Sequence, residues 1–168
     1  MKKNVYFVQV SAVYGESVKT AYLPYASGCL AAYAWDDPKI AENYNLGRFI
    51  FIRENVDKAI DSLKEPFLVG FSSYIWNMEY NREFAKRLKR RYPECIVVFG
   101  GHNVKPDGSD LEEMPFCDIV IHGEGEEPFK ALLLALIENK SLSSVNNSCP
   151  SSLACLSIAS AIAFTKFS

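Results

Sequence analysis

Two short stretches of this 168-residue sequence gather side chains that could contact a ligand. In the first, Ser72, Ser73, Tyr74 and Trp76 follow the apolar run 67–71 and supply two hydroxyls, a phenol and an indole. In the second, Gly123, Glu124, Gly125 and Glu126 stand where an apolar run ends and a helix is expected to begin. Aromatic rings offer contact area with a polar end, and carboxylates with exposed N–H groups are typical of a helix N-terminus. Both stretches are candidates for a binding site.

A glycine pair and two histidines stand at similar positions. Gly100 and Gly101 follow the apolar run 96–99, where glycine permits a positive φ and also lets a flat ligand approach the backbone. The residues alone leave these two readings open. His102 and His122 are the only histidines, and each stands beside the end of an expected strand. We expect both to be spectators, because a lone loop histidine is more often a surface hydrogen-bonding residue than a metal ligand.

Several catalytic and metal-binding patterns are absent. The glycine-rich stretch 123–126 lacks the Gly-Lys-Ser/Thr ending of a P-loop, which argues against a nucleotide triphosphate. Ser72 and Ser73 lack the Gly-x-Ser-x-Gly elbow of a hydrolase nucleophile. No cysteine pair has zinc-site spacing. The sequence therefore predicts neither a catalytic residue nor a protein ligand to a metal.

The elements that must position these residues alternate between strand and helix. Apolar or β-branched runs predict five strands, at residues 4–10, 48–52, 67–71, 96–99 and 118–121. Helical patterns fill the connections between them. This alternation predicts an α/β fold with a doubly wound five-stranded parallel sheet, in the flavodoxin-like Rossmann order 2-1-3-4-5. The candidate loops would then meet at the carboxyl edge of that sheet, where ligands of such folds bind.

Composition narrows the class of protein. With 49% hydrophobic residues, 23% charged residues and a net charge of -2, the chain is neither disordered nor typical of nucleic-acid-binding proteins. The basic run 86–91 lies on an expected helix, and we interpret it as a solvated face. The first residues do not resemble a signal peptide, which favours a cytoplasmic protein. No partner membrane is expected, because the apolar run 153–164 is too short to span one.

The end of the sequence differs from the rest. Residues 141–168 are rich in serine and in small apolar residues, and the alternation of strand and helix is complete before them. We therefore expect one domain at residues 1–140 and a segment at 141–168 that is not part of the fold.

Four stretches in this order resemble a known family. They are LPYASGCLAAYAW (23–35), VGFSSYIWNMEYN (69–81), YPECIVVFGGHNV (92–104) and DIVIHGEGEEPF (118–129). Together they resemble the cobalamin-binding domain at the N-terminus of radical SAM enzymes, over about residues 4–137. The resemblance implies that Ser72, Ser73, Tyr74 and Trp76 line the corrin and its nucleotide tail, that Gly100 and Gly101 leave room for the tail, and that Gly123, Glu124, Gly125 and Glu126 border its far side.

The sequence departs from related families at two motifs. The Asp-x-His-x-x-Gly motif that supplies a histidine to cobalt in many cobalamin domains is absent, and residues 11–15 read SAVYG instead. The resemblance thus implies cobalamin without a protein histidine ligand. CxxxCxxC, which holds the iron–sulfur cluster of the catalytic domain, is also absent from this chain. We expect no iron–sulfur cluster here and no catalysis by the chain alone, with a radical SAM catalytic domain as a possible partner.

Two alternatives stay open. One is a flavodoxin-like electron carrier, in which Tyr74 and Trp76 would flank the ring system of FMN. It is the weaker reading, because the loop after the first strand is poor in the serine and threonine that bind the FMN phosphate. The other alternative is an interaction or remnant domain that binds no cofactor.

Overall fold

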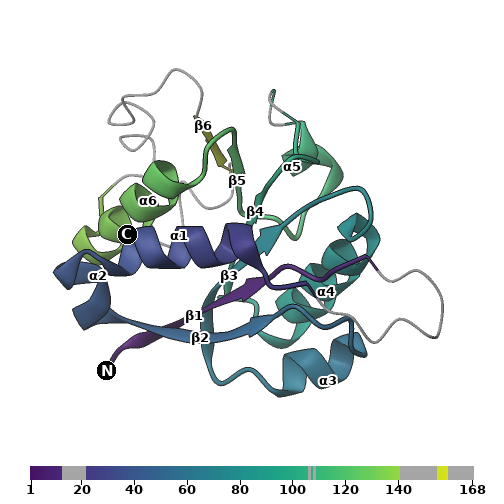
Figure 1. Cartoon of the computed structure of the whole chain (residues 1–168), viewed down its shortest axis with the longest axis horizontal. Helices are drawn as coiled ribbons and strands as arrows, with labels where there is room; N and C mark the ends of the chain where they lie inside the picture. Colours follow the sequence, from purple (N-terminus) through teal and green to yellow (C-terminus); the bar gives the residue numbers. More distant parts are fainter. Residues whose placement is uncertain (13–21, 106, 108, 141–154, 159–168) are drawn as a thin grey trace.

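A six-stranded sheet forms the centre of the computed structural model, which describes residues 1–12, 22–105, 107, 109–140 and 155–158 (Figure 1). Along the chain the elements are β1 (Lys3–Val8), α1 (Tyr25–Trp35), α2 (Pro38–Asn43), β2 (Tyr44–Ile50), α3 (Val56–Asp61), β3 (Pro66–Ser72), α4 (Met78–Arg91), β4 (Ile96–Gly100), α5 (Asp110–Glu113), β5 (Ile119–His122), α6 (Glu126–Glu138) and β6 (Cys155–Ile158). The strand order is β2-β1-β3-β4-β5-β6. β1 to β5 are parallel, which confirms the predicted fold and the order 2-1-3-4-5.

The sixth strand comes from the segment that we expected outside the fold. β6 runs antiparallel to β5, with Ile158 opposite Ile119 and Cys155 opposite His122. An edge strand such as β5 presents unpaired backbone groups that a further strand can satisfy, and strand-and-helix alternation does not reveal such an addition. Residues 141–154 and 159–168 lie outside the described residues. The domain boundary at residue 140 therefore stays a prediction.

Helices cover both faces of the sheet, as Figure 1 shows. On one side α3 and α4 close a core that includes Val8, Phe71 and Phe84. On the other side α1, α2 and α6 close a second core that includes Phe7 and Phe129. Phe7 and Val8 are neighbours in β1 and belong to different cores, because successive strand residues point to opposite faces. This two-sided burial explains the continuous apolar runs in the sequence.

The helix N-termini on the two sides are capped differently. On α3, the Asn55 side chain caps the helix by accepting hydrogen bonds from the N–H groups of Asp57 (3.0 Å) and Lys58 (3.3 Å). On α1, no side-chain cap comes from the preceding Pro24. Instead Oε1 of Gln9, just past β1, accepts a hydrogen bond from the Ser27 N–H at 2.9 Å. The start of α1 is therefore held directly against the end of β1.

Among the residues that the structure describes, none of the helices combines the length and the apolar composition needed to cross a membrane.

Candidate functional site

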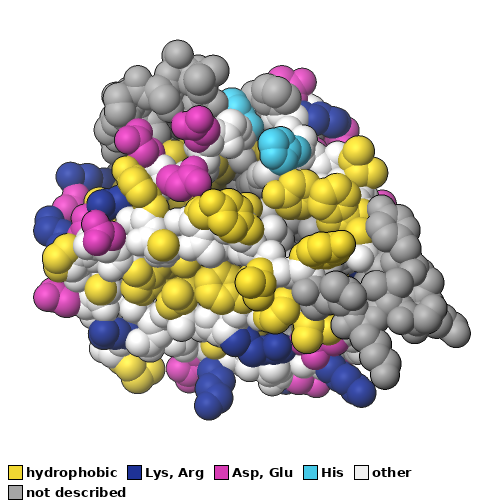
Figure 2. Space-filling model, in the orientation of Figure 1, with side chains coloured by type: hydrophobic (Ala, Val, Ile, Leu, Met, Phe, Trp, Pro, Cys, Tyr) yellow, Lys and Arg dark blue, Asp and Glu magenta, His cyan; other side chains and the backbone are white. Residues whose placement is uncertain are grey.

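A cavity of about 860 Å³ lies at the carboxyl edge of the sheet, and we call it the edge cavity. Its wall consists of Phe7 from β1, of residues at or after the carboxyl-terminal parts of β3, β4 and β5, and of residues near the starts of α1 and α6: Phe7, Ala26, Ser27, Leu30, Gly70, Phe71, Ser72, Tyr74, Val98, Gly100, Gly101, His102, Val104, Ile121, His122, Gly123, Glu124, Gly125, Glu126 and Phe129. In Figure 2 the histidines, in cyan, lie in the upper part of the view, above a group of hydrophobic side chains in yellow. The cavity therefore brings together three strand ends that are far apart in the sequence.

Most of the predicted site residues line the edge cavity. Those that do are Ser72, Tyr74, Gly100, Gly101, Gly123, Glu124, Gly125 and Glu126, whereas Ser73 and Trp76 are not part of its wall. The wall also includes Phe7, Ile121 and Phe129, which belong to the core under α1 and α6. The cavity thus continues from the strand ends into the layer between the sheet and these two helices.

Ser73 holds two loops together rather than facing the cavity. It is fully buried, its N–H donates to the Gly100 carbonyl oxygen at 2.7 Å, and its own carbonyl oxygen accepts from the Asn103 N–H at 3.1 Å. Gly101 packs against it with φ of +101°. A Cβ on Gly101 would lie 2.7 Å from the Ser73 carbonyl oxygen and 2.9 Å from its nitrogen. A side chain at Gly101 would therefore meet the backbone of Ser73 rather than enter the cavity, although the Gly101 backbone does line the cavity.

Two buried asparagines fix the loop between β3 and α4. Asn77 Oδ1 accepts from the Tyr74 N–H at 2.8 Å, and Nδ2 donates to the carbonyl oxygens of Ser72 (3.0 Å) and Val10 (3.2 Å). Asn81, one turn later on α4, donates to Ser72 at 3.3 Å and is fully buried like Asn77. The role of Asn77 and Asn81 in fixing this loop was not predicted from the sequence. The sequence pattern that could have indicated this role is the pair of asparagines four residues apart at the start of a helix, because residues at that spacing share one helix face.

Aromatic rings extend from the cavity wall to the surface. The Tyr74 ring stacks on Trp76 with centroids 4.6 Å apart and an angle of 5°, and its centroid lies 5.7 Å from that of His102. Trp76 is 48% exposed. Arg53, from the loop before α3, donates from Nη2 to the Trp76 carbonyl oxygen at 2.7 Å. The indole of Trp76 therefore contacts the wall of the edge cavity by stacking on Tyr74, and the hydrogen bond from Arg53 fixes the Trp76 backbone.

Both histidines are nearer to the site than expected. His102 and His122 line the edge cavity, whereas the sequence led us to expect surface hydrogen-bonding residues. The described residues contain no group of three or more His, Cys, Asp or Glu side chains that could hold a metal ion. Residues 13–15 of the loop that replaces the cobalt-histidine motif lie outside the described residues. That the histidines are spectators stays a prediction.

The side of the cavity at α6 carries carboxylates. Glu124 and Glu126 belong to the wall, and α6 begins after Gly125 without a side-chain cap. At the start of α1, a hydrogen bond with Cys29 raises the pKa of Tyr25, and the charge of Glu126 adds to the shift. This rim is therefore negative at neutral pH, which disfavours polyanionic ligands such as nucleotide triphosphates.

The first turns of α1 supply wall residues that the sequence analysis missed. Ala26, Ser27 and Leu30 line the edge cavity, and a Cβ on Gly125 would lie 3.0 Å from Cδ2 of Leu30. Ser27 is fully buried, and its Oγ has no hydrogen-bond partner in the described part of the chain. Helical periodicity in the sequence placed α1 but did not reveal which of its residues face a cavity.

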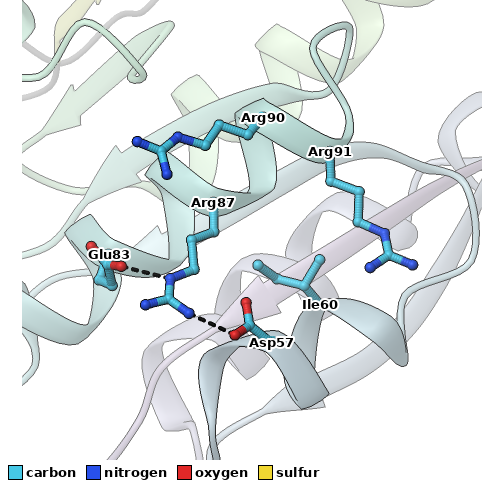
Figure 3. Close-up of a pocket in the computed structure, with 6 residues that line it drawn as sticks. All are labelled: Asp57, Ile60, Glu83, Arg87, Arg90 and Arg91. Atoms are coloured by element: carbon cyan, nitrogen blue, oxygen red, sulfur yellow. Dashed lines mark hydrogen bonds and ion pairs between the residues drawn. The ribbon is translucent and has the colours of Figure 1, made fainter.

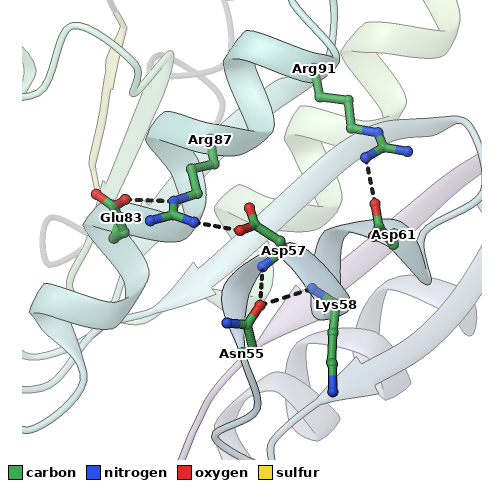
Figure 4. A network of polar contacts seen from close by, with 7 residues as sticks. All are labelled: Asn55, Asp57, Lys58, Asp61, Glu83, Arg87 and Arg91. Atoms are coloured by element: carbon green, nitrogen blue, oxygen red, sulfur yellow. Dashed lines mark hydrogen bonds and ion pairs between the residues drawn. The ribbon is translucent and has the colours of Figure 1, made fainter.

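A second cavity of about 460 Å³ lies between α3 and α4, and we call it the charged groove (Figure 3). It is lined by Asp57, Ile60, Glu83, Arg87, Arg90 and Arg91. Arg87 bonds to Glu83 and to Asp57, each at 2.6 Å, and Arg91 pairs with Asp61 (Figure 4). Arg87 and Arg91 thus have acidic partners, whereas Arg90 has no ion-pair or hydrogen-bond partner in the described part of the chain and lies exposed, in agreement with the interpretation of the run 86–91 as a largely solvated face.

The chain is similar to a known domain family and to part of two methyltransferases, one of which is named as cobalamin-dependent. The family model for the B12 binding domain matches residues 10–133. The cobalamin-dependent radical SAM methyltransferase TokK of Streptomyces tokunonensis is 36% identical over 133 residues, which are 78% of this chain and 18% of TokK. The 2-(S-pantetheinyl)-carbapenam-3-carboxylate methyltransferase of Streptantibioticus cattleyicolor is 33% identical over 134 residues, 79% of this chain and 18% of that enzyme. The chain thus spans less than a fifth of the length of these relatives.

Solved structures of TsrM, a radical S-adenosylmethionine methyltransferase from Kitasatospora setae, share the fold. The structure with cobalamin and a [4Fe-4S] cluster matches with a TM-score of 0.61 and 19% identity, over 86% of this chain and 26% of TsrM. The structure with tryptophan and a SAM analogue matches with the same TM-score and 18% identity, over 86% of this chain and 27% of TsrM. At this identity the likeness supports the fold alone.

Proposed function

The chain belongs to the B12-binding domain family, and on that premise we propose that it binds cobalamin in the edge cavity and serves a radical SAM methyltransferase. The single observation that carries this proposal is the edge cavity itself, at the carboxyl edge where open α/β sheets bind ligands. Its volume of about 860 Å³ is that of a site for a large ligand.

The residues of the edge cavity fit cobalamin well. A broad macrocycle with a long tail needs close backbone approach over the strand ends and a channel below them. The glycines at positions 100, 101, 123 and 125 offer the first, and the apolar wall under α1 and α6 offers the second. The unpartnered Oγ of Ser27 is a polar atom that a ligand could satisfy. FMN has no comparable support, although the fold itself would accept it.

The proposed contacts keep the ten predicted residues but change some of their roles. Tyr74 and Trp76 offer ring area to the corrin, and the backbones of Gly100 and Gly101 border the tail. Ser73 acts indirectly, since it holds these glycines in place. Gly123, Glu124, Gly125, Glu126 and Ser72 complete the wall. Bound cobalamin would supply a cobalt centre that can carry a methyl group, and we propose that no histidine of this chain coordinates it.

We propose further that the chemistry belongs to a partner domain. The chain spans 18% of TokK, which is named as a radical SAM methyltransferase. A catalytic domain of that class, with its own iron–sulfur cluster, would act on the cofactor that residues 1–140 hold.

Reconstitution tests the proposal. Purified protein is mixed with hydroxocobalamin or FMN, passed through a desalting column and examined by visible absorbance. We expect cobalamin to be retained at one molecule per chain and FMN to be lost. Ala26→Trp would fill the edge cavity and prevent retention, whereas Ala32→Trp, on an exposed position of the same helix, would not. Retention of FMN, or of neither compound by the wild type, would overturn the proposed function.

A further inference from the structure

The hydroxyl of Ser27 differs from the other polar groups of the edge cavity wall because it is buried and unpaired. Its residue is fully buried, and its Oγ has no hydrogen-bond partner among the described residues. An unsatisfied buried hydroxyl costs free energy in the folded protein unless another molecule pairs with it. Because Ser27 also lines the edge cavity, a bound ligand can provide that pairing.

The position of Ser27 is fixed before any ligand binds. Gln9 Oε1 accepts the hydrogen bond from its N–H at 2.9 Å, and the Gly28 N–H donates to the Pro24 carbonyl oxygen at 2.8 Å. These bonds anchor the first turn of α1 on both sides of Ser27. The hydroxyl is therefore held on a rigid element, as a selective contact requires.

The surroundings of Ser27 limit which part of a ligand can reach it. The same wall contains Phe7, Leu30 and Phe129, so the hydroxyl faces a largely apolar channel between α1 and the sheet. Ser27 has no solvent-exposed surface, so a ligand atom reaches its hydroxyl only if neighbouring wall side chains move aside. A narrow group that enters the channel requires a smaller movement than a broad macrocycle over the strand ends. The first turn of a helix is electropositive, which favours an acceptor on that group and the hydroxyl as donor.

From these observations we infer that Ser27 donates a hydrogen bond to an acceptor atom on the nucleotide tail of the cofactor, and so makes the site selective for ligands that carry such a tail. This inference rests on the proposed function. It adds a binding residue on α1, an element from which the sequence analysis named no contact. A site with a polar group aimed at one ligand atom rejects analogues that lack the atom, because the group is then left unpaired.

Two ligands and two variants test the inference. Affinities for cobalamin and for cobinamide, which lacks the nucleotide tail, are measured by absorbance titration of wild type, Ser27→Ala and Ser62→Ala. Ser62 is a matched serine at the end of α3, where its Oγ donates to the Ala59 carbonyl oxygen at 2.6 Å and accepts from Arg48. Melting temperatures of the ligand-free proteins are measured alongside.

The two serines should respond in opposite ways. Ser27→Ala should weaken cobalamin binding about tenfold, the worth of one hydrogen bond, and leave the affinity for cobinamide within twofold of wild type. Its melting temperature without ligand should equal or exceed that of wild type, because the variant removes an unpartnered hydroxyl. Ser62→Ala should melt at a lower temperature and bind both ligands normally.

Three results would overturn the inference. They are an unchanged cobalamin affinity in Ser27→Ala, an equal loss for cobalamin and cobinamide, and a fall in melting temperature as large as that of Ser62→Ala. In each of these cases the wild type still retains cobalamin, so the failure is distinguishable from failure of the proposed function.

Discussion

The edge cavity and the charged groove lie on opposite faces of the sheet and differ in how their polar groups are satisfied. In the charged groove, Arg87 and Arg91 pair with acidic side chains of the same protein. In the edge cavity, the wall is made of glycine backbone and apolar side chains, and the buried hydroxyl of Ser27 has no described partner. Arg87 and Arg91 are thus paired without a ligand, whereas the Ser27 hydroxyl is not.

This difference is a better guide to function than charge. The charged groove has the more concentrated charge, yet its exposed ion pairs contribute little to stability. The edge cavity has few charges, but the buried hydroxyl of Ser27 has no hydrogen-bond partner within the described residues. The following variants test this contrast, from the largest expected effect to the smallest.

Gly101→Val should destabilise the fold as well as the site. The positive φ is unfavourable for valine, and its Cβ would lie 2.7 Å from the Ser73 carbonyl oxygen. We expect a loss of about 3 kcal/mol and a melting temperature about 10 °C lower, measured by circular dichroism. A stable variant that merely loses cobalamin would show instead that a side chain at this position faces the ligand.

Asn77→Ala should also be costly, because it removes the amide that bonds to Tyr74, Ser72 and Val10. Leaving these backbone groups unpaired costs about 2 kcal/mol, or about 6 °C in melting temperature. Asn43→Ala is the control, since the Asn43 amide donates to the Lys39 carbonyl oxygen in an exposed position. Equal effects of the two variants would show that burial of Asn77 does not matter.

Trp76→Ala should affect the ligand more than the fold. The indole is half exposed and stacks on Tyr74, so its removal should change the melting temperature by only about 1 °C. Cobalamin binding should weaken about tenfold through lost contact area, as measured by titration. Leu46→Ala, an exposed apolar truncation on β2, should leave binding unchanged. The proposed corrin contact would be refuted by normal binding in Trp76→Ala.

Arg87→Ala should have the smallest effect. Its ion pairs with Glu83 and Asp57 are solvent-exposed, so the melting temperature should fall by less than about 2 °C, and less still in high salt. Cobalamin affinity should not change. A loss of binding would mean that the charged groove, and not only the edge cavity, communicates with the ligand.

The sequence was sufficient to predict the fold because its signals are local. Continuous apolar runs and a recognisable cap such as Asn55 mark most of the elements, and parallel topology then brings their following loops to one edge. β2 was harder to delimit: it begins at Tyr44, four residues before the predicted start. Its first residues are strand because they pair with β1, and periodicity does not encode that pairing.

The site was predictable only in part. Glycines and polar residues that follow β3, β4 and β5 identified the parts of the cavity wall at these three strand ends. The role of Ser27 was not predictable, because a serine in a helical pattern looks alike whether it faces solvent or a cavity. The close packing of Gly101 on Ser73 was also hidden, since it depends on contact between two loops 28 positions apart in the sequence. Such contacts appear only once the layers are assembled.

The central position of β1 in the sheet also determines when the site can form during synthesis of the chain. β1 is flanked by β2 and β3, so the first strand to be synthesised waits for residues as late as 72 before both of its edges are paired. The wall of the edge cavity runs from Phe7 to Phe129 and is complete later still. Under the proposed function, a cofactor would therefore find no complete site during early folding. It would stabilise a sheet that the chain has already built, and its supply would govern the lifetime of the protein rather than its rate of folding.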